Sequence, residues 1–277
     1  MTRSAQGSRI ILGLLLAVSI LSPVRFVRSE DAKPKAQLVV FAAASLTESF
    51  KEFGKQFETR HPNATVTFNF GASNQLRFQI EQGAKADLFA SANTKEMEAL
   101  VRSGGANKDA SKTFARNRLV LLFPKDNPVK LAAIEDLAKP GIKLIIADKA
   151  VPVGNYTLQM LDKMTADGKF GATFKDSVLK NVVSEEDNVK SVVAKVRLGQ
   201  GDAGIAYVSD MISAAKEVGT LEIADAYNPI AVYPIVALSK AAQPDLAKDF
   251  IDELLSSAGQ EIIRKNGFMP AEDKKKE

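Results

Sequence analysis

The fold is decided by the stretch Leu38-Val39-Val40-Phe41-Ala42-Ala43-Ala44-Ser45-Leu46-Thr47-Glu48. Its apolar first half predicts a buried strand. Ser45 then stands where the N-cap of a following helix belongs, with Glu48 three positions on. A helix that starts at the end of a buried strand offers free backbone N–H groups and the positive end of its dipole to an anion. The same two residues also fit a box in which they only cap each other, so this stretch alone leaves both interpretations open.

The composition excludes several classes of protein. The chain has 277 residues, of which 45% are hydrophobic, and this length favours two cores over one. It contains no cysteine. A disulfide scaffold, a thiolate metal site, a cysteine nucleophile and attachment through a lipidated cysteine are therefore excluded.

Residues 1–30 predict a secretory signal peptide. Two arginines precede an apolar run from Ile10 to Leu21, and a polar stretch follows. The run is too short to span a membrane comfortably, and we expect cleavage at a site between about residues 22 and 36. The predicted location of the mature protein is the periplasm.

The signal peptide also accounts for most of the positive charge. The whole chain has 37 basic and 33 acidic residues, and residues 1–30 hold four of the basic and one of the acidic. The remainder is therefore close to neutral, which argues against a nucleic-acid partner. The charged tail, residues 271–277, mixes both signs and is interpreted as a solvated end.

Strands and helices alternate along the rest of the chain, which predicts an α/β fold of mostly parallel sheets flanked by helices. Buried strands are expected at residues 65–70, 87–90, 143–147, 203–207 and 230–238. Two further strand-to-helix junctions resemble the first, one at Gly71-Ala72-Ser73-Asn74 and one at Val151-Pro152-Val153-Gly154. Ligands of such sheets bind beyond the carboxyl ends of the strands, which is where Ser45 and Ser73 fall.

The pattern restarts near Leu119, which divides the chain into two predicted lobes. The first lobe comprises residues 37–120 and 235–270, and the second comprises 121–234. Strands near Leu119 and Val236 would join the lobes, and two such crossings form a hinge.

Five motifs in order carry a resemblance to a known family. They are Phe41-Ala42-Ala43-Ala44-Ser45-Leu46-Thr47, Gly71-Ala72-Ser73-Asn74, Ala86-Asp87-Leu88-Phe89-Ala90-Ser91-Ala92, Val151-Pro152-Val153-Gly154-Asn155-Tyr156 and Gly204-Ile205-Ala206-Tyr207-Val208-Ser209-Asp210. Together they resemble the periplasmic molybdate-binding proteins of ABC transporters, which are type II solute-binding proteins with two lobes. Each motif alone is weak, and their order behind a signal peptide gives the resemblance its weight.

The resemblance implies a site without catalysis. Molybdate, and tungstate as well, would be held by the hydroxyls of Ser45, Ser73 and Tyr207 and the backbone N–H groups of Val153 and Val189, with Val153 where the family commonly has alanine. Molybdenum would enter only as the oxyanion, with no direct protein ligand to the metal and no cofactor. The implied partners are an inner-membrane permease and its ATPase, and the protein would be a monomer.

Two alternatives remain open from the sequence. The ligand could be another tetrahedral oxyanion such as sulfate, or the chain could be an enzyme acting on a phosphate or sulfate ester. An enzyme would need a general base or a metal near Ser45. His61, the single histidine, is interpreted as a surface loop residue. Asp87, Asp187 and Asp210 are better explained one by one, with Asp187 as the N-cap of a helix that has Val189, Val192, Val193 and Val196 at helical spacing.

Overall fold

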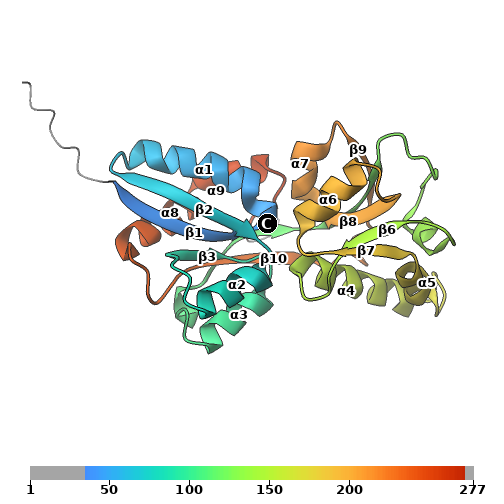
Figure 1. The fold of residues 1–277 in the computed structure, drawn as a ribbon, viewed down its shortest axis with the longest axis horizontal. Helices are drawn as coiled ribbons and strands as arrows, with labels where there is room; N and C mark the ends of the chain where they lie inside the picture. Colours follow the sequence, from blue (N-terminus) through green and yellow to red (C-terminus); the bar gives the residue numbers. More distant parts are fainter. Residues whose placement is uncertain (1–34, 272–277) are drawn as a thin grey trace, which may run out of the picture. The chain divides into compact units, whose positions relative to one another are not determined.

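The computed structural model describes residues 35–271 of the chain. These residues include two five-stranded sheets (Figure 1). The predicted signal peptide and all but the first residue of the charged tail lie outside these residues. Residues 35–271 belong to one compact unit. No helix among them is long and apolar enough to cross a membrane.

The first sheet has the strand order β2-β1-β3-β10-β4. Its helices cover both faces. Helices α1, α8 and α9 pack together on one face, and α2 and α3 pack on the other (Figure 1). We call this sheet and its helices the first lobe. Its elements are β1 (Ala36–Ala43), η1 (Ala44–Leu46), α1 (Thr47–Arg60), β2 (Ala64–Gly71), α2 (Ser73–Glu81), β3 (Leu88–Ala90), α3 (Thr94–Arg102), η2 (Lys108–Ala110), β4 (Lys112–Asn117), β10 (Ala231–Ala237), α8 (Pro244–Leu255) and α9 (Ser257–Lys265).

The second sheet repeats this plan with the order β7-β6-β8-β5-β9. Helix α6 packs on one face and α4 packs on the other, with α5 in contact with α4 (Figure 1). We call this sheet and its helices the second lobe. Its elements are β5 (Leu119–Pro124), η3 (Ile134–Ala138), β6 (Leu144–Ala147), α4 (Pro152–Ala166), α5 (Phe174–Lys180), β7 (Val182–Glu186), α6 (Val189–Arg197), β8 (Ala203–Tyr207), η4 (Val208–Asp210), α7 (Met211–Ala214) and β9 (Val218–Glu222).

The predicted α/β class is confirmed, and each sheet is mixed, because one strand, β10 or β5, runs against the other four. Strands β2, β1 and β3 run parallel, as do β7, β6 and β8. In each sheet the fourth strand, β10 or β5, arrives directly from the other lobe and pairs antiparallel on both sides. Successive parallel strands of one sheet are joined by a crossover connection, usually a helix. Strands β5 and β10 each come from the other lobe without such a helix.

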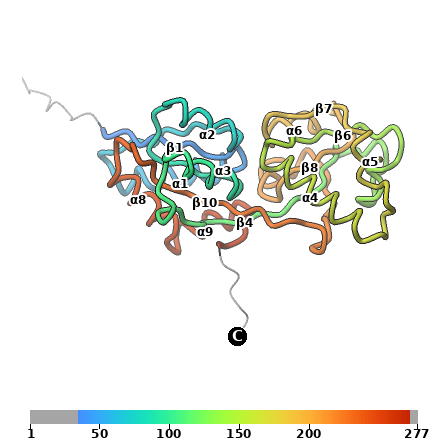
Figure 2. The backbone as a smooth tube through the Cα atoms, turned by 90° about the horizontal axis from the view of Figure 1, so that it is seen from below, coloured from blue at the N-terminus to red at the C-terminus, as the bar shows by residue number. Residues whose placement is uncertain are grey.

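The chain passes between the lobes twice. Arg118 alone separates β4 from β5, and residues 223–230 lead from β9 back to β10. Figure 2 shows the two connections running beside each other. The Asn228 side chain ties them together, because its amide oxygen accepts the Leu119 N–H at 2.9 Å and its amide nitrogen donates to the Leu119 carbonyl at 2.8 Å. The exact lobe boundaries stay a prediction.

An aromatic core fixes the junction between β1 and α1. Three phenylalanines at helical spacing on α1, Phe50, Phe53 and Phe57, are fully buried. Phe53 meets Phe250 of α8 edge to face, with ring centroids 4.8 Å apart. Aromatic pairs in this geometry stabilise by about 0.5–1.5 kcal/mol beyond the area they bury. The turn that carries Ser45 therefore rests on a rigid base.

Candidate functional site

Ser45 lies at the end of β1, but it does not cap a helix. A single 3-10 turn, η1, follows the strand, so α1 starts at Thr47 with Leu46 as an N-cap that makes no side-chain bond. The Ser45 hydroxyl instead lies 2.9 Å from the hydroxyl of Tyr233 on β10. The capping interpretation of Ser45 and Glu48 is therefore wrong, because the 3-10 turn moves the N-cap from Ser45 to Leu46.

Ser73 occupies the first position of α2, and Ala72 is the N-cap. The Ser73 hydroxyl oxygen accepts the backbone N–H of Ala92 at 3.0 Å. This bond joins the start of α2 to the segment after β3. A hydroxyl has one proton and two lone pairs. The Ser73 proton therefore remains available to a further acceptor.

Val153 supplies the first backbone N–H of α4, because Pro152 at the preceding position has none. Gly154 lets the helix start press against the end of β6. A Cβ at this position would lie 2.1 Å from the carbonyl oxygen of Asp148, closer than real Cβ atoms come to any atom. Glycine is therefore required here by the close approach of two backbones.

Val189 begins α6, and the cap differs from the prediction. Asn188, not Asp187, is the N-cap, and its side-chain oxygen accepts the N–H of Ser191 at 3.0 Å. This bond satisfies the N–H of the third helical position. The N–H of Val189 at the first position has no partner within the helix and is available to a ligand.

Tyr207 ends β8 and is 1% exposed. Its hydroxyl has no hydrogen-bond partner among the described residues, which is unusual for a buried polar atom. Burial raises the pKa of Tyr207 well above its usual value, and nearby Tyr233, Tyr156 and Asp210 raise it further. The hydroxyl therefore stays protonated and can donate.

All five predicted site residues line one small cavity between the lobes, which we call the anion cavity after the ligand predicted from the sequence. The first lobe contributes residues of three segments and the second lobe contributes residues of three more. No charged residue is among those that line it. They are Ala43, Ala44, Ser45, Gly71, Ala72, Ser73, Ala92, Val151, Pro152, Val153, Asn188, Val189 and Tyr207. The cavity measures about 20 Å³, enough for a single water molecule. A larger anion requires its walls to move apart slightly.

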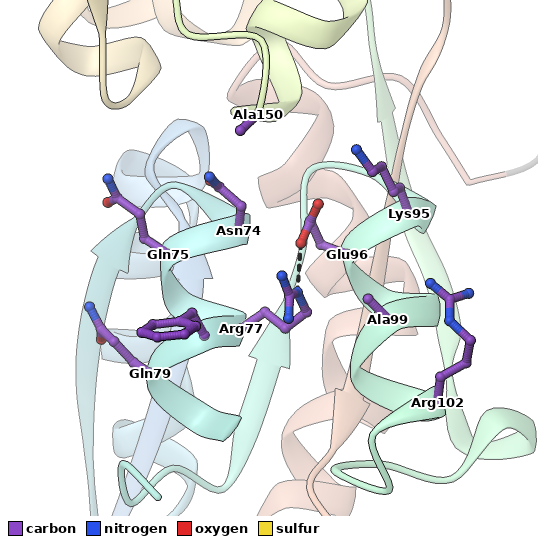
Figure 3. A pocket seen from close by; sticks show the side chains of 10 residues that line it. Asn74, Gln75, Arg77, Gln79, Lys95, Glu96, Ala99, Arg102 and Ala150 are labelled. Carbon is purple, nitrogen blue, oxygen red and sulfur yellow. Dashed lines mark hydrogen bonds and ion pairs between the residues drawn. The ribbon is translucent and has the colours of Figure 1, made fainter. Parts of the chain in front are cut away.

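A wider groove lies beside the anion cavity, between α2 and α3, and measures about 640 Å³. Figure 3 shows Arg77 of α2 pointing across this groove to Glu96 of α3, while Ala150 of the second lobe faces its upper end. The Arg77 guanidinium is already paired, at 2.7 Å with Glu96 and at 2.5 Å with Glu81. An open groove whose central cation is neutralised lacks the convergent donors of the smaller cavity.

The three aspartates considered as a cluster have separate roles. Asp87 accepts the N–H groups of Val39 and Gln243, and Asp210 accepts that of Tyr207. Asp187 accepts hydrogen bonds from the side chains of Asn188, the N-cap of α6, and Ser191 within that helix. The residues between 35 and 271 include no group of three or more histidine, cysteine or acidic side chains placed to hold a metal ion.

His61 follows the last residue of α1 and is half-buried. It stacks on Phe57, with ring centroids 4.1 Å apart, and its Nε2 lies 2.6 Å from Glu253. His61 does not line the anion cavity. His61 therefore packs against Phe57 and bonds to Glu253, away from Ser45.

Tyr233 is the residue of the site that sequence reasoning missed. It is fully buried on β10 behind the cavity, and its ring lies 6.0 Å from that of Tyr207. Burial raises the pKa of Tyr233 far above its usual value, so this hydroxyl also stays protonated. No local motif marks it, because its partner Ser45 lies 188 residues away along the chain.

Comparison with known proteins points to one family. A family model of bacterial extracellular solute-binding proteins matches residues 38–269. The molybdate-binding protein of Mycobacterium tuberculosis is 37% identical over 231 residues, which cover 83% of this chain and 84% of that protein.

Two solved structures show the same fold. The periplasmic molybdate-binding protein of Azotobacter vinelandii superposes with a TM-score of 0.72 at 22% identity, covering 84% of this chain and 98% of that one. The sulfate-binding protein of Mycobacterium tuberculosis superposes with a TM-score of 0.77 at 18% identity, covering 85% and 87%. At these identities the likeness concerns the fold alone.

Proposed function

The chain belongs to the family of bacterial extracellular solute-binding proteins, and we propose that it captures molybdate, and tungstate as well, and delivers it to an ABC-type permease. The relatives that match over most of the chain are solute-binding proteins and not enzymes. Delivery would take place in the periplasm, with an inner-membrane permease and its ATPase as partners. The protein would act as a monomer, without a cofactor and without catalysis.

One observation carries the proposal: donors from both lobes converge on a cavity lined by no charged residue. The hydroxyls of Ser45, Ser73 and Tyr207 and the helix starts at Val153 and Val189 all reach it. The Tyr207 hydroxyl has no partner in the described protein, so a ligand acceptor would satisfy it. Hydrogen bonds to a charged acceptor contribute about 1.5–3 kcal/mol each, and helix N-termini add about 0.3–1 kcal/mol.

The donor set fits a fully deprotonated anion. Molybdate near neutral pH is a dianion whose oxygens can only accept hydrogen bonds. Ser73 already accepts the Ala92 N–H, so the proton of its hydroxyl is what it can offer a ligand. Phosphate at the same pH carries a proton, and its O–H group needs a hydrogen-bond acceptor. A closed site that offers donors would leave this O–H group without a partner. The site should therefore favour molybdate over phosphate.

Sulfate has the same charge and the same shape, but its bonds are shorter. The donors cannot distinguish it from molybdate by kind, so the distinction must come from the size of the closed cavity. The closely similar relative binds molybdate according to its name, and the likeness to a sulfate-binding protein is one of fold. We therefore favour molybdate.

Closure follows from the position of the donors. An anion that contacts both lobes binds the closed form better than the open one, so it shifts the population toward closure. The two connections beside Leu119 and Asn228 would act as the hinge.

Calorimetric titration of the purified protein with molybdate, tungstate, sulfate and phosphate tests the proposal. We expect a Kd below about 1 µM for molybdate and tungstate, weaker binding of sulfate and no heat with phosphate. Heat with sulfate or phosphate but none with molybdate would refute it. Release of phosphate or sulfate from an ester substrate would establish the enzyme alternative instead.

A further inference from the structure

An ion pair joins the two lobes beside the anion cavity. Lys190 lies on α6, one residue after Val189, and Glu48 lies in the first turn of α1, three residues after Ser45. The Lys190 ammonium donates to a Glu48 carboxylate oxygen at 2.7 Å. Helix α6 also packs directly against η1, the turn that holds Ser45. The pair therefore links the two lobes at positions close in sequence to predicted ligand residues, Ser45 in the first lobe and Val189 in the second.

The same ammonium reaches the residue that positions Tyr207. Lys190 Nζ lies 3.2 Å from Oδ1 of Asp210, which is fully buried, and the other Asp210 oxygen accepts the backbone N–H of Tyr207 at 3.2 Å. Burial lowers the pKa of Lys190, but the charges of Asp210 and Glu48 outweigh this and raise it. Lys190 therefore stays charged at neutral pH.

The two bonds of Lys190 differ in what they require of the lobes. The bond to Asp210 lies within the second lobe and survives any movement between lobes. The bond to Glu48 spans the two lobes, so a movement that separates them would break it. An interaction that forms in one state alone shifts the equilibrium toward that state.

The geometry points to Glu48 and Lys190 as a clasp that holds the lobes closed around the bound anion without touching it. Both are positioning residues, and neither lines the anion cavity. The inference rests on the proposed function, because it assumes that an anion binds between the lobes. The clasp also neutralises Glu48, whose unpaired carboxylate near Ser45 would repel a dianion.

Glu48→Ala isolates the cross-lobe bond. Glu48 is 39% exposed, so its removal leaves no cavity, and Lys190 keeps Asp210 as its partner. Glu52→Ala is the matched control on the same helix. Glu52 pairs at 2.7 Å with Lys265 of α9 and accepts a hydrogen bond from the Asn266 side chain at 3.0 Å, and both partners belong to the first lobe. The two variants remove the same group from the same helix, but only Glu48→Ala removes a bond to the other lobe.

The dissociation rate of the anion is the measurement, taken by stopped-flow on the full protein. Wild type is first titrated with molybdate, tungstate and sulfate, and an anion that binds is used throughout. We expect Glu48→Ala to release it about fivefold faster and to lose the acceleration by salt that wild type shows, while Glu52→Ala releases it at the wild-type rate. Equal rates in wild type and Glu48→Ala, or an equal effect of Glu52→Ala, would overturn the clasp.

A distance measurement separates this result from the fate of the proposed function. Since the chain has no cysteine, labels can be attached at Gln56→Cys on α1 and Lys216→Cys beyond α7, both exposed positions. The label distances should shift to larger values in Glu48→Ala. If wild type binds none of the three anions, the proposed function fails, and these ligand-free distances alone decide the clasp. Unchanged distances would then overturn it.

Discussion

Replacing Tyr207 by phenylalanine should weaken anion binding without weakening the fold. The hydroxyl is buried and bonds to no described protein atom, so Tyr207→Phe removes no bond from the ligand-free protein. The bound state loses one hydrogen bond to a dianion, worth about 1.5–3 kcal/mol. The Kd for molybdate should therefore rise by about 10- to 150-fold. The unfolding midpoint of the ligand-free variant should equal or exceed that of wild type.

Tyr156→Phe provides the matched control. Tyr156 lies on α4 near Tyr207 and is also buried, but its hydroxyl accepts a backbone hydrogen bond from Val232 and it does not line the anion cavity. Its loss should lower the free energy of unfolding by about 1 kcal/mol and leave the Kd for molybdate unchanged. The two substitutions delete the same atom and should have opposite consequences.

Calorimetry gives the affinities, and urea unfolding of the ligand-free proteins gives the stabilities. The reasoning would be refuted if Tyr207→Phe bound molybdate as tightly as wild type. It would also be refuted if Tyr207→Phe lost as much stability as Tyr156→Phe, because the Tyr207 hydroxyl would then have a partner within the protein.

Three further predictions concern other parts of the site and the fold. Ser45→Ala and Ser73→Ala should each weaken molybdate binding by about 10- to 100-fold in calorimetry while circular dichroism of the ligand-free protein stays unchanged; normal binding by both would contradict their assignment as ligands. Gly154→Ala should lower the thermal midpoint and weaken binding together, because its methyl group would displace the start of α4; a wild-type midpoint would show that this junction is loose. The bond from Lys139 and backbone N–H bonds hold the pKa of Asp136 at about 2, below its usual 3.8, so its charge stabilises the fold above pH 3.8 and this is lost as the pH falls toward 2. Asp136→Asn should therefore cost about 1–2 kcal/mol near pH 6 in urea unfolding, with a difference that shrinks below about pH 4; a pH-independent difference would contradict the charge argument.

The central strands could be predicted from the sequence, but of the four edge strands only β2 could be. Strands β3, β6 and β8 are buried along their whole length, and their continuous apolar runs identified them. Strands β4, β7 and β9, which the sequence did not predict, lie at the edges of their sheets. An edge strand such as β7 has one neighbour and mixes exposed with buried residues, so its composition resembles that of a loop.

The positions of the site could be predicted, but their local bonding could not. Family motifs indicated the five residues that the structure brings to one cavity, although their role as anion ligands stays a prediction. The local caps assigned to Ser45 and Asp187 were wrong. A serine after a strand can bond to its own helix or to a distant group, and sequence spacing reports only the first choice. Tyr233 and Lys190 bond to partners 188 and 142 residues away along the chain, which no local pattern encodes.

The absence of a cation from the anion cavity explains how the lobes can close over so little space. An arginine or lysine facing an empty cavity would be a buried unpaired charge, which costs several kcal/mol. Neutral hydroxyls and N–H groups cost less when they are unpaired, about 1–3 kcal/mol each, and Ser45 and Ser73 already bond within the protein. The nearby cation, Lys190, is instead held by two carboxylates outside the cavity. Under the proposed function, full charge would stand where it controls closure and partial charge would stand where the ligand binds. A dianion that enters such a site would accept hydrogen bonds from several neutral donors and form no ion pair. Its release would then require only that the lobes move apart.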